Sequence, residues 1–280
     1  MSFRQLQKIT KLGIPVVITL HDQRLTTGGC HYSLDCREFQ SGCNNCPKVS
    51  HLLRSKVRRN SRDLRELFTN NYQNIKLTAP SNFMVSQAAK SSIMSSQKVI
   101  FLPNLIPKYM NYNKSKNRIK SRNSFRIGVA SVDPYDPIKG GDLIYELEQF
   151  LEKDSNGIEI VFLANFPNEK YFDFWNSLDC LLAPSRADNS PNVIHEAKQF
   201  GLPIIATNVG GITEMLFPDV DVSIDLSKLS LESILIAINN IKNKPHDIKQ
   251  IERMQQSYFK YVSEPLKKTI SIYQELLETK

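Results

Sequence analysis

The chain has 280 residues, of which 41% are hydrophobic and 23% charged, a composition typical of a globular protein with a packed core. Its apolar runs are too short to span a bilayer, and no apolar stretch follows the first residues as it would in a signal peptide. We therefore expect a cytoplasmic protein with room for one large domain or two small ones.

The net charge of +8 is concentrated in two basic stretches, residues 54–65 and 108–126. The first is predicted as a helix whose apolar face is formed by Leu52, Leu53, Val57, Leu64 and Leu67. Its charge fits a solvated helix face, or a peripheral contact with anionic lipids at the inner face of the cell membrane. No aromatic residues alternate with these charges as they do in single-strand nucleic-acid binders, so no nucleic-acid partner is expected.

The first part of the chain alternates short apolar strands with helices. The expected strands are residues 13–20, 75–79 and 99–102, and the expected helices are residues 3–11, 61–69 and 83–91. Such alternation indicates a parallel sheet. The polar, basic residues 108–124 lack periodicity and are predicted as a linker.

After the linker the alternation resumes. The expected strands are residues 125–131, 158–163, 179–183 and 203–207, and the expected helices are residues 141–153, 169–177, 191–200, 229–241 and 247–277. The last helix is predicted to break before Pro265. We therefore predict a domain over residues 1–107, a second over residues 125–245, and C-terminal helices over residues 246–280 that pack back on the first domain.

In open α/β sheets, ligands bind at the carboxyl ends of the strands. This rule points at His21 and Asp22, at residues 131–139 and at residues 185–192. In the last of these, Ser190 is predicted as the N-cap of a helix and Pro191 as its first residue. Gly201 is predicted to end that helix in a left-handed conformation.

The start of this helix has free N–H groups and a positive dipole, which suit a diphosphate. Asp188 precedes the helix and Glu196 lies within it, and carboxylates accept hydrogen bonds from the hydroxyls of sugars and ribose. A structural explanation also exists, because acidic residues near a helix start stabilise its dipole whatever the function.

The spacing from Asp188 to Glu196, followed by Ala197 and by Gly201-Leu-Pro203, resembles the donor-site motif of retaining family 4 glycosyltransferases. The Asp-Asn-Ser-Pro-Asn version is similar to the polysaccharide-biosynthesis branch. The resemblance implies that Glu196 binds the donor ribose and that Asp188 acts at the transferred sugar. It also implies that the backbone around Asn189, Ser190 and Asn192 holds the diphosphate.

Two further blocks carry the resemblance. Lys139 and Gly140 resemble the family's Lys-Gly element, whose lysine neutralises the leaving phosphate, although Asp133 stands where many members have an arginine. The stretches from Thr19 to Cys36 and from Gly42 to Pro47 are similar to a block of exopolysaccharide transferases of the colanic-acid type. This similarity implies that His21 is a catalytic residue near the reacting centre.

The resemblance covers essentially the whole chain and implies a GT-B-like α/β fold with two Rossmann-like parallel-sheet domains, the N-terminal one incomplete. The implied reaction is retaining transfer of a hexosyl group from a nucleotide-diphosphate sugar to a polysaccharide or lipid-linked oligosaccharide acceptor, with no cofactor or metal at the reaction centre. A truncated, non-catalytic nucleotide-sugar-binding or partner subunit is the alternative.

Four cysteines lie in a Gly-rich excursion over residues 28–47, namely Cys30, Cys36, Cys43 and Cys46. In a cytosolic chain, a group that ends in Cys-x2-Cys favours thiolate ligands of a structural zinc ion over disulfides. Packed, reduced cysteines and disulfides remain as alternatives.

Overall fold

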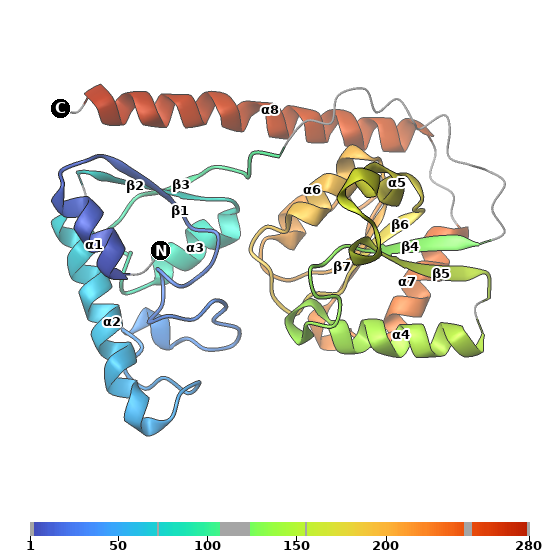
Figure 1. Cartoon of the computed structure of the whole chain (residues 1–280), viewed down its shortest axis with the longest axis horizontal. Coiled ribbons are helices and arrows are strands. Elements are labelled where there is room, and N and C mark those ends of the chain that lie inside the picture. The colour runs from blue at the N-terminus through green and yellow to red at the C-terminus, as the bar shows by residue number, and fades with distance from the viewer. Residues whose placement is uncertain (1–2, 72, 107–123, 155, 244–247, 279–280) are drawn as a thin grey trace. The chain divides into compact units, whose positions relative to one another are not determined.

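The computed structural model describes residues 3–71, 73–106, 124–154, 156–243 and 248–278. It consists of two compact units, the first made of Met1–Leu105 with Glu264–Lys280 and the second of Ile106–Ser263 (Figure 1). Each unit has an α/β architecture around its own parallel sheet, which confirms the predicted fold class. Apart from Ser124, the predicted linker lies outside the described residues.

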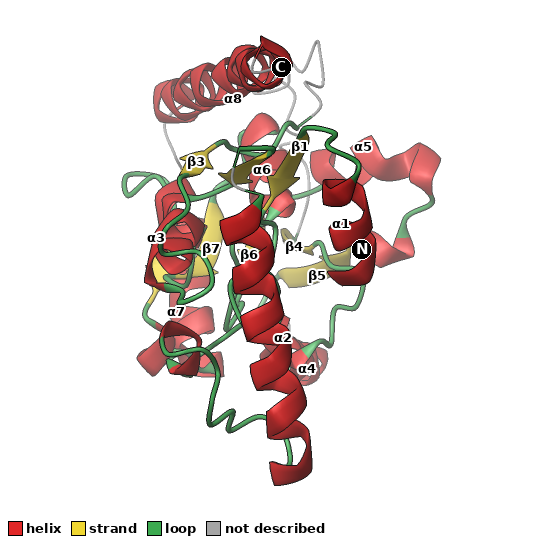
Figure 2. Cartoon of the chain, turned by 90° about the vertical axis from the view of Figure 1, so that its left-hand side faces the viewer, coloured by secondary structure: helices red, strands yellow, loops and turns green. Residues whose placement is uncertain are grey.

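The first unit is built on a three-stranded parallel sheet of order β1-β2-β3. Its elements up to residue 105 are α1 (Phe3–Lys11), β1 (Val16–Thr19), α2 (His51–Asn70), β2 (Ile75–Ala79), α3 (Asn82–Lys90) and β3 (Val99–Phe101). Figure 2 shows α2 as a long helix in this unit. Its core is formed by side chains of the strands and helices, among them Leu6, Ile18, Phe68, Leu77 and Met84.

Helix α2 is longer than predicted, and the prediction of its apolar face is wrong for the residues at its start. Leu64 and Leu67 are buried as predicted, but Leu52 is 86% exposed and Leu53 is 49% exposed. A helix of 20 residues is about 30 Å long, whereas strands of three to five residues span roughly 10–17 Å. The first turns of α2 therefore extend beyond the sheet that covers its second half.

The second unit is built on a five-stranded parallel sheet of order β5-β4-β6-β7-β8. Its elements are β4 (Phe125–Val129), α4 (Gly141–Lys153), β5 (Ile158–Phe162), α5 (Tyr171–Asn176), β6 (Cys180–Ala183), α6 (Asn192–Gln199), β7 (Ile204–Thr207), β8 (Val222–Ile224) and α7 (Leu231–Asn243). Strand β8 was not expected, because three residues with an exposed serine in the middle give too short an apolar run to recognise.

The strands of this sheet are covered on both faces. In β7, Ile204 and Ala206 belong to a core cluster that includes Trp175, whereas Ile205 belongs to a separate cluster that includes Ile127. Successive side chains of a strand point to opposite faces, so both faces must be apolar. This explains why the strands read as continuous apolar runs rather than as alternating patterns.

Helix α8 (Ile248–Glu278) is a single element that contains Pro265, so the predicted break before this proline is wrong. Proline removes only one backbone donor from the helix ladder. Thr269 Oγ1 donates a hydrogen bond to Pro265 O at 2.8 Å, and Ile272 and Leu276 are buried beyond it. Packing of the following turns therefore keeps the helix intact. No helix in the described ranges combines the length and apolarity needed to cross a membrane.

A buried ion pair fastens helix α6 within the second unit. The side chains of Lys198 and Asp221 are each only 1% exposed, and Lys198 Nζ donates to Asp221 Oδ2. Asp221 also accepts from Ile204 N at 2.9 Å and Phe217 N at 2.7 Å. Lys198 lies 3.3 Å from Met254 Sδ on α8. Burial lowers the pKa of Lys198 and raises the pKa of Asp221, and the charge of each partner opposes the shift of the other.

We expect Asp221→Ala to lower the free energy of unfolding by about 3–5 kcal/mol, because it leaves the buried Lys198 ammonium uncompensated. In Lys198→Met/Asp221→Ala the loss should be smaller than in Asp221→Ala alone, since no buried charge remains. Urea denaturation of the three proteins measures both quantities. A loss below about 1 kcal/mol in Asp221→Ala would contradict the assignment of this pair as a charged tie.

Candidate functional site

The candidate site lies at the carboxyl ends of three neighbouring strands in the second unit. The chain passes from β4 to β5 on one side and then returns to β6 on the other, so the strand order reverses between β4 and β6. Ligands of open α/β sheets bind at such a switch point. The loops after β4, β6 and β7 meet there, and they carry Lys139, Asp188 and the Gly210–Gly211 turn.

Lys139 is the last residue of a 3-10 turn, Pro137–Lys139, that leads into α4. Asp136 begins the turn, and its Oδ1 accepts from Ile138 N at 2.9 Å. Gly140 follows with φ of 79°, and a Cβ placed on it would stand 2.3 Å from Pro184 O. Only glycine fits this conformation and this approach, which explains the Lys-Gly pair in physical terms.

Asp188 is 7% exposed in the loop after β6. Its Oδ2 accepts from Lys139 Nζ at 2.5 Å, and its Oδ1 accepts from Ser190 N at 3.3 Å. Its backbone oxygen accepts from Gly211 N at 3.1 Å, next to Gly210, whose φ is 55°. The structure therefore brings together Lys139 and Asp188, two predicted site residues that lie 49 positions apart in the chain.

Helix α6 begins one residue later than predicted. Pro191 is its N-cap, without a side-chain capping bond, and Asn192 is its first residue, so the prediction for Ser190 and Pro191 is wrong. The N–H of Ser190 is bonded to the side chain of Asp188, a local turn that holds Ser190 in the loop. Gly201, with φ of 65°, ends the helix as predicted.

The other predicted donor residues surround the start of α6. Asn189 is buried at 3% exposure, Ser190 and Glu196 are half-buried, and Asn192 is exposed. Burial raises the pKa of Glu196, and a hydrogen bond from Tyr171 on α5 opposes that rise. Tyr171 was not predicted as a site residue, because an aromatic residue on a short amphipathic helix carries no local signal of such a contact.

Arg186 is a second residue that the sequence did not reveal. Its guanidinium forms two hydrogen bonds to the Asp142 carboxylate, at 2.6 and 2.7 Å, and thereby joins the loop after β6 to the first turn of α4. The pairing lowers the pKa of Asp142 and raises the pKa of Arg186. Nothing in the local sequence links these two positions.

His21 belongs to the first unit, whereas Asp188 and the predicted donor-binding residues belong to the second. It is exposed two residues after the end of β1, and its backbone N–H donates to Thr19 O at 3.0 Å. The neighbouring Asp22 carboxylate lies 3.4 Å from His31 Nε2 and 3.6 Å from Arg24 Nε. The position of His21 at the end of a strand agrees with the prediction, and its catalytic role stays a prediction.

The cysteine excursion contains all four cysteines that were predicted as zinc ligands. Among the described residues, which include all four cysteines, no group of three or more His, Cys, Asp or Glu side chains is arranged to hold a metal ion. Cys43 Sγ accepts from Gly28 N at 3.2 Å, and burial raises the pKa of this thiol to about 11, which keeps it protonated at neutral pH. A structural zinc ion at these cysteines stays a prediction, with packed, reduced cysteines as the alternative.

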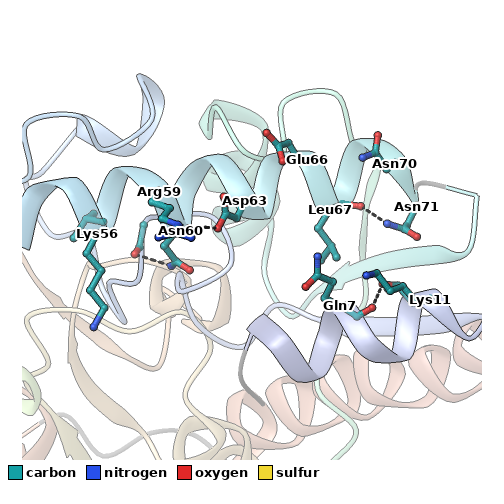
Figure 3. A pocket seen from close by; sticks show the side chains of 13 residues that line it. Gln7, Lys11, Lys56, Arg59, Asn60, Asp63, Glu66, Leu67, Asn70 and Asn71 are labelled. Atoms are coloured by element: carbon teal, nitrogen blue, oxygen red, sulfur yellow. Dashed lines mark hydrogen bonds and ion pairs between the residues drawn. The ribbon is translucent and has the colours of Figure 1, made fainter.

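A groove of about 1120 Å³ lies elsewhere, between α1 and α2 of the first unit. Figure 3 shows its polar lining, with Lys56, Asn60 and Asp63 along α2 and Gln7 and Lys11 on α1. Asn60 Nδ2 donates to Gly28 O at 2.9 Å, so α2 also holds the start of the cysteine excursion. None of the predicted donor residues lines this groove.

The geometry of the second unit, with its switch-point lysine and carboxylate, agrees with a match to a known family. Residues 137–227 match the family model described as "Glycosyl transferases group 1". This match lies within the second unit. Over 238 residues the chain is 22% identical to a protein of Escherichia coli (strain K12) named as a colanic acid biosynthesis glycosyl transferase, WcaC. The match covers 74% of this chain and 55% of that protein, so the chain spans about half the length of this curated relative.

Solved structures agree on the fold. The chain resembles HepE of Anabaena, solved in complex with UDP, with a TM-score of 0.63 at 14% identity over 99% of this chain and 77% of that one. It resembles sucrose-phosphate synthase from Thermosynechococcus elongatus with a TM-score of 0.63 at 13% identity, over 94% of this chain and 68% of that one. These likenesses confirm the predicted GT-B-like fold.

His195, next to Glu196 on α6, generates a prediction about pH. Its ring lies 5.7 Å from the ring of Tyr258, and burial lowers its pKa from 6.5 to about 4. Between pH 6.5 and pH 4 the His195 ring therefore stays neutral in the folded state, whereas in the unfolded chain it takes up a proton. The contribution of this difference to the free energy of unfolding is fully present above pH 6.5 and is lost as the pH falls towards 4. The loss by pH 4 amounts to about 3 kcal/mol.

We expect His195→Gln to flatten the fall in melting temperature between pH 6.5 and pH 4, because the substituted side chain does not titrate there. Differential scanning calorimetry across this range measures the effect. His51→Gln, at an exposed position on α2, is the control and should leave the slope unchanged. An unchanged slope in His195→Gln would show that His195 is not the buried neutral group described here.

Proposed function

We propose that this chain is a glycosyltransferase that takes a hexosyl group from a nucleotide-diphosphate sugar and transfers it to a polysaccharide or lipid-linked oligosaccharide acceptor. The observation that carries the proposal is the contact between Lys139 and Asp188 at the switch point of the sheet in the matched domain. The UDP and UDP-glucose named for the HepE structures support a nucleotide-sugar donor.

In this proposal the backbone N–H groups around Asn189, Ser190 and Asn192 hold the diphosphate at the start of α6. Glu196 accepts hydrogen bonds from the donor ribose, and Lys139 faces the phosphates. When the bond between the sugar and the diphosphate breaks, its electron pair leaves with the nucleotide, and a fixed cation stabilises that charge. No metal ion or cofactor is needed for this step.

At the transferred sugar, the proposal assigns catalytic roles to Asp188 and His21. When the diphosphate pairs with the Lys139 ammonium, the Asp188 carboxylate is released from the lysine and accepts hydrogen bonds from the sugar hydroxyls. The transfer is proposed to retain the anomeric configuration, as in family 4 glycosyltransferases. This feature rests on the resemblance of the motif from Asp188 to Glu196 and is tested by the configuration of the product.

A non-catalytic nucleotide-sugar-binding or partner subunit is the second candidate. The observation that favours it is the unequal size of the two sheets, three described strands in the first unit against five in the second. Incubation of the protein with radiolabelled nucleotide sugars and detergent-solubilised membrane acceptors separates the two functions. Labelled glycan supports the transferase, whereas binding of the sugar without transfer or hydrolysis supports the subunit.

We expect Glu196→Gln to weaken binding of the nucleotide-sugar donor about tenfold to a hundredfold, because a hydrogen bond to a charged group contributes about 1.5–3 kcal/mol. Isothermal titration with UDP and a panel of UDP- and GDP-sugars measures the affinity. Glu152→Gln, an exposed position near the end of α4, is the matched control and should bind like the wild type. If no nucleotide or nucleotide sugar binds the wild type, the assignment of the donor site is wrong.

The proposed location is cytoplasmic and peripheral to the inner face of the cell membrane, and α2 is the element proposed to make the contact. Arg58, Arg59 and Arg62 are exposed along it, and Leu52 is exposed at its start. Anionic lipids attract such cations by about 1 kcal/mol each near the surface, and an exposed leucine can enter the interface.

We expect the protein to sediment with vesicles that contain anionic phosphatidylglycerol and not with vesicles of neutral phosphatidylcholine. Arg58→Glu/Arg62→Glu should abolish that sedimentation, and about 0.5 M salt should also abolish it by screening. Equal sedimentation of the wild type with both kinds of vesicle, or with neither, would refute an electrostatic membrane contact through α2.

A further inference from the structure

Arg186 is bonded to the turn that carries Lys139 through both its backbone and its side chain. The backbone N–H donates to Ile138 O at 2.7 Å, and Nη1 donates to Pro137 O, also at 2.7 Å. These two carbonyls belong to the residues immediately before Lys139. The turn cannot shift away from the loop after β6 without breaking both bonds.

The same guanidinium holds the chain on the other side of Lys139. Nη1 and Nη2 donate to the two carboxylate oxygens of Asp142, which lies three residues after the lysine. Arginine presents its donors in a rigid, planar fork, so one side chain can bond a carbonyl and a carboxylate at once. A lysine at this position would supply a single point charge and could not span the turn in the same way.

The tip of Lys139 meets the same loop two residues further on, at Asp188. The side chains of Arg186 and Asp142 are 35% and 51% exposed, and exposed ion pairs contribute little to folding stability. The Arg186–Asp142 pair has two short hydrogen bonds in an exposed position. It is therefore better explained by the turn that it holds in place than by a contribution to folding stability.

We propose that Arg186 is a positioning residue that fixes the turn from Pro137 to Asp142, so that Lys139 is presented to Asp188 and to the donor diphosphate. The diphosphate part rests on the proposed function, whereas the presentation of Lys139 to Asp188 does not. Arg186 itself does not touch the donor in this mechanism.

The first test does not depend on any ligand. Reductive methylation with ¹³C-formaldehyde labels the lysines and keeps their charge, and the signal of Lys139 is identified by its loss in Lys139→Ala. We expect Arg186→Ala to move this signal towards its position in Asp188→Asn, and Arg186→Lys to do the same. Arg126→Ala removes the Arg126–Glu159 pair at the opposite edge of the sheet and should leave the signal unchanged. An unmoved signal in Arg186→Ala overturns the proposal.

The second test measures UDP affinity by isothermal titration in a double-mutant cycle. Arg186→Ala should weaken binding about tenfold, the effect of losing one well-placed interaction with a charged group. In a Lys139→Ala background the same substitution should have no further effect, because the two residues act as one unit. If the two losses simply multiply, Arg186 acts on the nucleotide without Lys139, and the positioning role is wrong.

The two tests separate this inference from the proposed function. Absence of UDP binding in the wild type would count against a uridine-nucleotide donor, while a moved Lys139 signal in Arg186→Ala would still establish the positioning role. Circular dichroism melting of each variant checks its fold, and Arg186→Lys provides a second, charge-preserving variant if Arg186→Ala is poorly folded.

Discussion

The loop between β6 and α6 is held on both sides by backbone contacts that only glycine permits. A Cβ on Gly140 would stand 2.3 Å from Pro184 O, and a Cβ on Gly210 would stand 1.8 Å from Asp188 O. Both glycines have positive φ, so a larger residue would be strained even if there were space. The contact between Lys139 and Asp188 exists because three loops approach one another this closely, and the whole candidate site depends on that approach.

Buried and exposed ion pairs have different tasks in the second unit. The pair of Lys198 and Asp221 is buried from water, and the Asp221 carboxylate also accepts a hydrogen bond from the backbone of β7, while Lys198 contacts α8. These contacts fasten α6, and with it Glu196, against β7 and α8. The pair of Arg186 and Asp142 is open to water, where its Coulomb energy is small, and it acts through direction and reach. One pair keeps the helix of the site in place, and the other keeps the turn opposite to it in place.

The predicted donor residues and the predicted histidine differ in what they require of the fold. The contacts among the predicted donor residues form within one compact unit, around one sheet edge, so they depend on the packing of that unit alone. His21 belongs to the other unit, beside a cysteine excursion held by hydrogen bonds such as that from Asn60 to Gly28 O. In the proposed function, binding of the donor therefore depends on the second unit alone, whereas the role of His21 also requires the first unit.

The sequence by itself determined most of the alternation of strands and helices and the left-handed end of α6 at Gly201, because these depend on neighbours in the chain. The resemblance of its motifs to a known family indicated the candidate residues Lys139 and Asp188. The sequence failed to predict where several helices begin and whether they continue. The first turns of α2 extend beyond its sheet, Pro265 stays inside α8, and the bond to Asp188 holds Ser190 out of α6. Only the tertiary structure placed Lys139 at Asp188 and joined Arg186 to Asp142, since strand order brings these positions together and no local pattern encodes strand order.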